Sequence, residues 1–212
     1  MKKIVFTAFA VFILNILPFL FYPELLLHYK TITLIIAACC IWLTQPAFSM
    51  KETKENKEED KFSILFILLA ASVSIVSANI EWANNFPAYE SNDTITIIGL
   101  CMIVLGIIIR VWAILTLGKY FTATVVVQQK QTLITSGPYK IVRHPSYLGA
   151  FLSIVGCAVF LNAYISIVVA TVLMCSCYVV RIHAEEKALV QYFGNEYVQF
   201  SQKTKRLFPF IW

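Results

Sequence analysis

The sequence predicts an all-α protein, a multi-pass transmembrane helix bundle of five to six spans. Of its 212 residues, 59% are hydrophobic and only 14% are charged, whereas soluble domains average roughly 45–50% apolar and about 25% charged residues. The apolar residues also gather in long uncharged runs of the length that crosses a bilayer. Together these features exclude a secreted disulfide scaffold, a disordered tail and an ordinary cytosolic enzyme. The net charge of +5 is too modest to indicate a nucleic-acid partner.

Four apolar runs predict the first four spans. They cover residues 4–22, 31–50, 62–80 and 94–109, and the last continues past Arg110 to about Leu117. Lys2 and Lys3 resemble the start of a signal peptide, but the run behind them is too long and lacks a cleavage site, so we expect a retained anchor. The mixed-charge run 51–61 is expected to be a solvated loop or a short polar extension of a helix.

The last two spans are expected to form a helical hairpin. Residues 145–180 carry no charge, and a single helix of that length would reach about 54 Å, well beyond a bilayer core of about 30 Å. We therefore expect a turn near Leu161–Asn162–Ala163, with at least one short arm packed against protein. Two glycine pairs with a spacing of seven residues predict close helix packing. They are Gly99 with Gly106 and Gly149 with Gly156.

Basic residues give the six spans a direction. All Lys and Arg residues except Lys30 and Arg110 fall on one side of the membrane if the chain crosses six times. The opposite loop, residues 81–93, carries only acidic charges. The positive-inside rule then places both termini in the cytoplasm. The corresponding location is the inner membrane in a bacterium or the endoplasmic reticulum in a eukaryote.

Familiar cofactor and metal motifs are missing from the sequence. It contains no G-x-G-x-x-G, no P-loop, no H-E-x-x-H and no G-x-S-x-G, so a nucleotide-like cofactor would not be held by a Rossmann domain. The six cysteines all lie inside apolar runs without histidine neighbours at metal-ligand spacing. We interpret them as small buried hydrophobes rather than as disulfides or metal ligands.

Polar residues concentrate between residues 118 and 149. Residues 121–127 are strand-like, and Arg143-His144-Pro145 directly precedes an apolar run. Pro145 suits the first turn of a helix, which would set His144 beside exposed backbone N–H groups that favour anions. An alternative is that Arg143 and His144 anchor the chain to lipid headgroups, with Tyr139 and Tyr147 as interfacial aromatics.

The C-terminal tail carries the second polar group. Arg181 and Glu185 are four residues apart and therefore share one helical face. Gly194 is expected to end this helix. Arg181 and Glu185 could form a surface ion pair worth a few tenths of a kcal/mol. The alternative is a polar site at the membrane boundary, facing the loop that precedes the hairpin.

The order of these motifs resembles the isoprenylcysteine carboxyl methyltransferase family, a group of membrane methyltransferases related to phospholipid methyltransferases. The resemblance rests on TLITSGPYKIVRHPSYLGAF, an apolar hairpin, and RIHAEEKALVQYFGNEYVQFSQKTKRLFPFIW. It extends from about Thr124 to Trp212 and fades through the fourth span. The apolar runs predict transmembrane helices over residues 1–93, with the polar loop 51–61, and the resemblance implies a methyltransferase core over residues 94–212. The parts of that core would be a span, a cofactor loop (118–145), a helical hairpin (146–180) and a helical tail (181–212).

The resemblance also implies a cytosolic pocket for S-adenosylmethionine, formed by the loop before the hairpin and the tail. Arg181 matches the family position that meets the carboxylate of the substrate, so a lipidated acceptor such as a prenylated cysteine would enter from the bilayer. No metal is implied. The positions carried over to the cofactor are Gln128, Gln131, Thr132, Leu133, Ile134, Tyr139, His144, Pro145, Ser146, Tyr147 and Glu185.

Other functions stay open at this point. A phospholipid amine or a small thiol would be a poor partner for a carboxylate-binding Arg181, and Glu185-Glu186 favours a methyltransferase over a related nicotinamide-dependent sterol reductase. A transporter or scaffold would be expected to carry several charges inside its spans. Only Arg110 lies within a span, close enough to one end to snorkel to the surface. The oligomeric state cannot be predicted.

Overall fold

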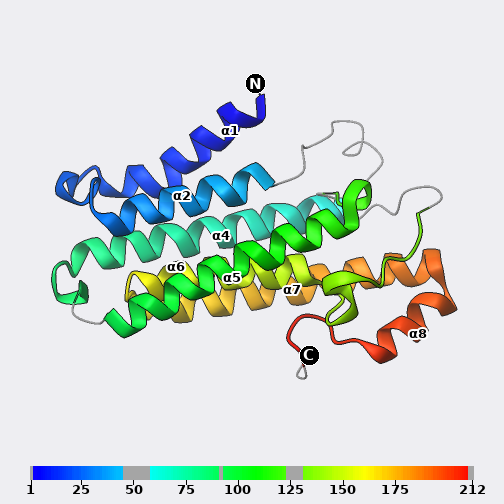
Figure 1. The fold of residues 1–212 in the computed structure, drawn as a ribbon. Coiled ribbons are helices and arrows are strands. Elements are labelled where there is room, and N and C mark those ends of the chain that lie inside the picture. The colour runs from blue at the N-terminus through cyan, green and yellow to red at the C-terminus, as the bar shows by residue number, and fades with distance from the viewer. Residues whose placement is uncertain (1, 45–57, 91–92, 123–130, 210–212) are drawn as a thin grey trace.

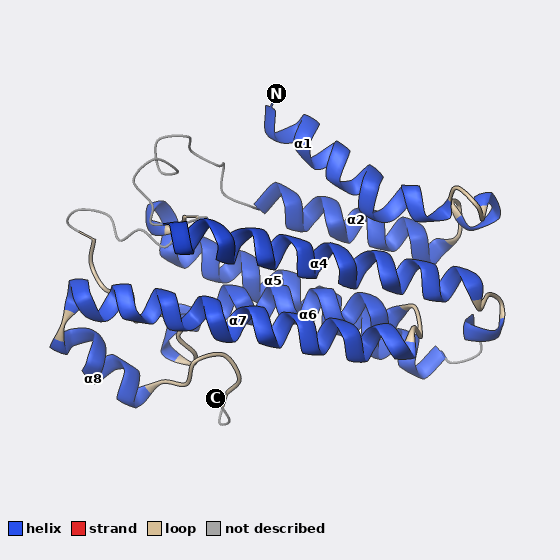
Figure 2. Ribbon diagram, turned by 180° about the vertical axis from the view of Figure 1, so that it is seen from behind, coloured by secondary structure: helices blue, strands red, loops and turns tan. Residues whose placement is uncertain are grey.

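The structure is a computed structural model that describes residues 2–44, 58–90, 93–122 and 131–209. Within these ranges the regular elements are all helices, arranged as a lengthwise bundle (Figures 1 and 2). Three helical segments, Ser63–Asn84, Asp93–Tyr120 and Tyr164–Phe193, are long and apolar enough to cross a membrane, and Ile4–Phe19, Tyr29–Thr44 and Pro145–Phe160 are shorter apolar helices. The predicted all-α bundle with six apolar helical segments is thereby confirmed.

The helices follow the predicted apolar runs closely. The main helices are α1 (Lys2–Val11), α2 (Tyr29–Thr44), α4 (Glu58–Asn84), α5 (Asp93–Leu117), α6 (Pro145–Phe160), α7 (Tyr164–Phe193) and α8 (Asn195–Lys203). A π-helical turn, η1 (Phe12–Ile16), continues α1. Short 3-10 turns lie at Leu17–Phe19, Pro23–Leu25, Ala88–Glu90, Gly118–Tyr120 and Gly137–Lys140. At 1.5 Å per residue the 30-residue α7 is about 45 Å long, so it extends beyond a bilayer core of about 30 Å.

The predicted hairpin has its turn at the predicted residues, 161–163. Helix α6 ends at Phe160 and α7 begins at Tyr164. Asn162 adopts a positive φ of 56°, a conformation that asparagine tolerates better than most residues. Its side-chain amide donates to the carbonyl of Tyr89, at 2.7 Å, and to Oγ1 of Thr96, at 3.1 Å. These bonds fix the hairpin turn against the N-terminal end of α5.

Helices α5 and α6 pack at very short range through glycines. A Cβ atom on Gly106 would lie 2.6 Å from the carbonyl oxygen of Gly149, and one on Gly99 would lie 2.2 Å from the backbone nitrogen of Phe160. No larger residue fits at either position without separating the helices. The close packing predicted from the glycine spacing is therefore present. It sets the N-terminal end of α6 directly beside the last turns of α5.

The two ends of the bundle differ in character. Trp82, Phe19 and Phe160 pack in a core at one end, where the fully buried Lys30 pairs with Glu90 at 2.9 Å. The other end contains the C-terminal ends of α2, α5 and α7 and the N-terminal ends of α4 and α6 (Figure 1). Most basic residues within the described ranges belong to that second end, which also contains the described residues before α6 and the tail.

The tail folds back onto the loop that precedes α6. Helix α7 ends at Phe193, and Gly194 follows with a φ of 56°, as predicted for a helix-ending glycine. The backbone N–H of Arg143 donates to the carbonyl of Lys205, at 2.8 Å, and that of His144 donates to Arg206, at 3.0 Å. The predicted strand at residues 121–127 lies mostly outside the described residues, and Phe121 and Thr122 are not in a strand.

Candidate active site

One elongated cavity of about 280 Å³ runs from the loop and tail into the bundle. Its polar end is formed by the segment before α6, the start of α6 and the C-terminal part of α7. Its apolar arm continues between the helices towards Leu14 and Asn15 of η1. The apolar arm is lined by Leu34, Ala38, Ile41, Trp42, Ile64, Ile67, Leu68, Ala71, Ile75, Ala150, Ile154 and Cys157. The first ninety residues, which carried no recognisable motif, therefore form much of this wall.

Arg181 is a buried cation at the polar end. It is only 3% exposed, and its Nη1 donates to Oγ of Ser63 on α4, at 2.8 Å. Its Nε donates to the hydroxyl of Tyr147, at 3.2 Å, and that hydroxyl donates to Oε2 of Glu185, at 2.7 Å. Tyr147 thus connects the arginine and the carboxylate. The interpretation of Arg181 as part of a surface ion pair does not hold, because the side chain is buried and lines the cavity.

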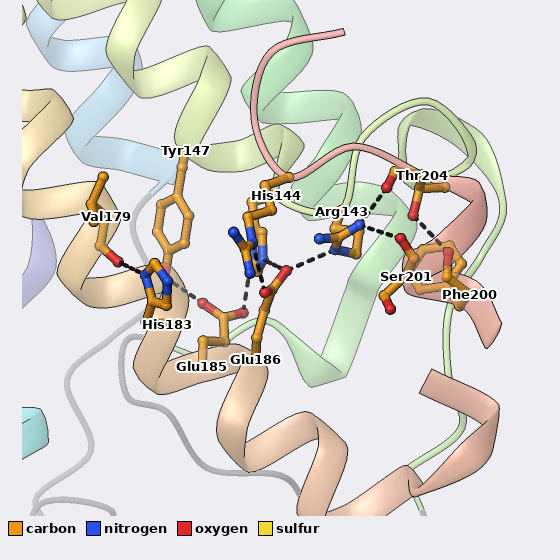
Figure 3. Close-up of polar contacts among 11 residues, drawn as sticks. Arg143, His144, Tyr147, Val179, His183, Glu185, Glu186, Phe200, Ser201 and Thr204 are labelled. Carbon is orange, nitrogen blue, oxygen red and sulfur yellow. Dashed lines mark hydrogen bonds and ion pairs between the residues drawn. The ribbon is translucent and has the colours of Figure 1, made fainter. Parts of the chain in front are cut away.

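His144 lies between two adjacent carboxylates (Figure 3). Its Nδ1 is 3.8 Å from Oε1 of Glu185, and its Nε2 is 3.5 Å from Oε1 of Glu186. The ring stacks on Tyr147 with centroids 5.7 Å apart, and Tyr147 stacks in turn on Tyr178 at 5.1 Å. His144 is almost fully buried, so the alternative of a lipid-headgroup anchor is wrong for this residue. It immediately precedes Pro145, which begins α6 as predicted.

Glu186 joins the loop to the tail, in the part of α7 that lies beyond the uncharged run. Arg143 Nε donates to its Oε1, at 2.7 Å, and Arg206 Nε donates to its Oε2, at 2.9 Å. Burial alone would raise the pKa of Glu186, but the neighbouring His144 and the hydrogen bonds from Arg143 and Arg206 outweigh it and lower the pKa to about 2. Arg143 also donates to backbone carbonyls of the tail, including that of Ser201 at 2.8 Å. Arg143 is therefore a structural link (Figure 3).

Arg110 is a cavity residue that the sequence interpretation placed wrongly. Instead of snorkelling to the surface, it is 6% exposed and lines the cavity. Its Nη1 donates to the carbonyl of Ser146, at 3.0 Å, and its Nε has no hydrogen-bond partner among the described residues. The available signal was a single charge inside an otherwise apolar span, which marks a functional candidate. Because α5 packs closely on α6, Arg110 lies beside the polar end of the cavity.

The cavity brings together most of the residues carried over from the family resemblance. Gln128 lies outside the described residues, Thr132 is exposed, and neither Thr132 nor Pro145 lines the cavity. Within the described part of the chain, no group of His, Cys, Asp or Glu residues has the arrangement of a metal site. The carried-over residues that do line the cavity are Gln131, Leu133, Ile134, Tyr139, His144, Ser146, Tyr147, Arg181 and Glu185.

Comparison with known proteins agrees with this architecture. Residues 97–191 match the model of the isoprenylcysteine carboxyl methyltransferase (ICMT) family. Protein-S-isoprenylcysteine O-methyltransferase B of Arabidopsis thaliana is 38% identical over 128 residues, which are 59% of this chain and 65% of that protein. A probable protein-S-isoprenylcysteine O-methyltransferase of Oryza sativa subsp. indica is 35% identical over 59% of this chain and 67% of its own length. The protein-S-isoprenylcysteine O-methyltransferase of Xenopus laevis is 34% identical over 68% of this chain and 50% of its own length.

A solved structure extends the likeness to the N-terminal helices. It is that of the eukaryotic intramembrane Ras methyltransferase ICMT, with 25% sequence identity and a TM-score of 0.68. The alignment covers 99% of this chain and 75% of that one. The chain spans about two thirds of its plant relatives and half of the Xenopus protein. On this evidence it is an integral membrane protein and belongs to the isoprenylcysteine carboxyl methyltransferase family.

Proposed function

We propose that this protein transfers the methyl group of S-adenosylmethionine to the carboxylate of a prenylated cysteine at the membrane interface. The observation that carries the proposal is the continuity of one cavity between a polar end and an apolar arm. The polar end offers buried Arg181 and Arg110 to an anion, and the apolar arm offers space to a hydrocarbon chain. The names of the relatives support a prenylcysteine acceptor.

The residues at the polar end fit S-adenosylmethionine. Glu185 lines the cavity and is suited to the positive charges of the cofactor. Leu133 and Ile134 also line it and give apolar contact for a purine ring, while Gln131 and Tyr139 contribute hydrogen-bonding groups. When bound, S-adenosylmethionine supplies a methyl group on a positively charged sulfur.

The protein contributes position and dehydration rather than a base. A carboxylate is already ionised at neutral pH, so its attack on a methyl group requires no proton removal. The guanidinium of Arg181 can hold the carboxylate through paired charge-assisted hydrogen bonds. The Tyr147 hydroxyl joins Arg181 to Glu185. It would therefore fix the position of the acceptor side of the site relative to the cofactor side. Burial of this cluster excludes water from the nucleophile.

We also propose that the polar end of the bundle faces the cytoplasm, with both termini on that side. The described residues contain six apolar helical segments, and an even number of crossings returns the chain to the side on which it began. The basic residues gathered at this end support the direction through the positive-inside rule. In this orientation the cofactor would enter from the cytoplasm and the lipid chain would enter from the bilayer.

A transfer assay with a labelled methyl group tests the function. Purified protein in detergent is offered S-adenosylmethionine with a prenylcysteine analogue, a phosphatidylethanolamine or a small thiol. We expect the label in a base-labile ester of the prenylcysteine and none in the other two acceptors, because two buried arginines favour an anion. Transfer to the amine or the thiol in preference would identify a different acceptor. Failure of well-folded protein to bind S-adenosylhomocysteine in calorimetry would contradict the proposal.

The apolar arm yields a prediction about chain length. Ala38 lines it, so Ala38→Phe fills space that a long prenyl chain needs. We expect KM for a long-chain acceptor to rise about 10–100-fold, since each excluded methylene forfeits about 0.8 kcal/mol, whereas a short-chain acceptor is unaffected. Ala8→Phe is the matched control, because Ala8 lies exposed on α1. An equal KM rise for both chain lengths would argue against binding in this arm.

A further inference from the structure

A second cavity lies beside Arg143, between the tail and the loop before α6. It has a volume of about 280 Å³ and is lined by Arg143 and residues 201–206. Its cationic residues are Arg143, Lys203, Lys205 and Arg206, and none of its lining residues is acidic. We refer to it as the basic tail cavity. It does not belong to the elongated cavity, although Arg143 lines both.

The lysines of the basic tail cavity differ from its arginines in their partners. Arg143 and Arg206 share the single carboxylate of Glu186, at 2.7 and 2.9 Å. Lys203 and Lys205 are exposed, and neither forms an ion pair within the described part of the chain. The two lysines therefore add positive charge and ammonium N–H donors to the cavity. This combination is suited to a phosphate group.

The position of the cavity points to a lipid as the source of that phosphate. Directly after Arg206 the chain turns into the bundle: Leu207 is fully buried, and Phe208 packs edge-on against Phe151 of α6, with centroids 5.3 Å apart. Ile141, next to the buried Val142 that pairs with Lys205, is 54% exposed. The cationic residues thus border directly on apolar side chains, the layering expected at the headgroup level of a membrane.

We propose that the basic tail cavity binds the phosphate of an anionic phospholipid from the adjacent leaflet. A juxtamembrane Lys or Arg contributes about 1 kcal/mol of attraction to an anionic membrane surface, so Lys203 and Lys205 act together. Bound lipid would fasten the end of the tail beside Arg143, which already holds the backbone at Ser201. The protein is therefore stabilised by anionic lipid through its tail, independently of which acceptor it methylates.

Thermal unfolding of the full-length protein tests this. The delipidated protein in a neutral detergent receives phosphatidylglycerol, phosphatidylcholine with the same chains, or inorganic phosphate at matched ionic strength. We expect phosphatidylglycerol to raise the unfolding midpoint by about 3–6 °C, because a ligand that binds only the folded state stabilises it. Phosphatidylcholine should leave the midpoint within about 1 °C. An equal shift with phosphatidylcholine overturns the charge argument, and an equal shift with inorganic phosphate overturns the lipid assignment.

Two variants locate the effect. In Lys203→Gln/Lys205→Gln the phosphatidylglycerol shift should fall by at least half. Lys119→Gln/Lys187→Gln removes the same charge from exposed positions outside the cavity and should keep the full shift. Native mass spectrometry provides a second measurement, in which the first variant retains fewer phosphatidylglycerol molecules than the control. Equal loss in both variants would show a diffuse charge effect and contradict the assigned site.

Discussion

Replacing Arg181 with alanine is expected to lower kcat/KM for a prenylcysteine acceptor by about 10²–10³-fold while affinity for S-adenosylhomocysteine changes less than about threefold. The magnitude is that of removing one preorganised charged donor from a buried site. The proposed separation of the two effects follows from the geometry, because Arg181 reaches Ser63 and Tyr147 while Glu185 lines the part of the cavity proposed for the cofactor. Steady-state kinetics and calorimetry measure the two quantities separately.

Arg181→Lys is the informative companion to the alanine variant. Lysine keeps the charge but lacks the planar fork that grips both carboxylate oxygens, so we expect turnover between those of the wild type and the alanine variant. Unfolding midpoints of both variants show whether the buried site still folds. Equal losses of turnover and cofactor affinity in Arg181→Ala would remove the proposed division of roles.

The adjacent carboxylates Glu185 and Glu186 should give opposite phenotypes when each is changed to glutamine. Glu185 lines the elongated cavity, so Glu185→Gln should weaken S-adenosylhomocysteine binding at least tenfold and shift the unfolding midpoint little. Glu186 holds Arg143 and Arg206, so Glu186→Gln should reduce the free energy of unfolding by about 3 kcal/mol, as the lowering of its pKa implies. Calorimetry and denaturation measure the two outcomes.

The pH dependence of stability provides a further test of the role of Glu186. The pKa of Glu186 is lowered from 4.5 to about 2 in the folded protein. Its contribution to stability is therefore complete above pH 4.5 and is lost as pH falls from 4.5 towards 2. We expect the difference in unfolding free energy between wild type and Glu186→Gln to shrink across this interval. A difference that stays constant with pH would contradict the ion-pair role of Glu186.

Local patterns in the sequence were enough for the helices and their ends. The uncharged run over residues 145–180 predicted the hairpin, and Pro145 and Gly194 predicted a helix start and a helix end that the structure has. The glycine spacing predicted the close packing of α5 on α6, which Gly106 and Gly149 provide. These features depend on residues that are close together in the chain or that recur on one face of a helix. They can therefore be predicted from the sequence alone.

The sequence by itself thus determined an all-helical membrane bundle with a polar loop and tail at one end. The family resemblance added candidate residues for the cofactor and substrate site. Only the tertiary structure decided which side chains meet. Glu185 and Glu186 are neighbours in the chain but point about 100° apart around α7, so the rotation of that helix sends one to the cavity and the other to the tail. In the same way the packing of α5 on α6 buries Arg110, and the N-terminal helices line the apolar arm through contacts that no local pattern specifies.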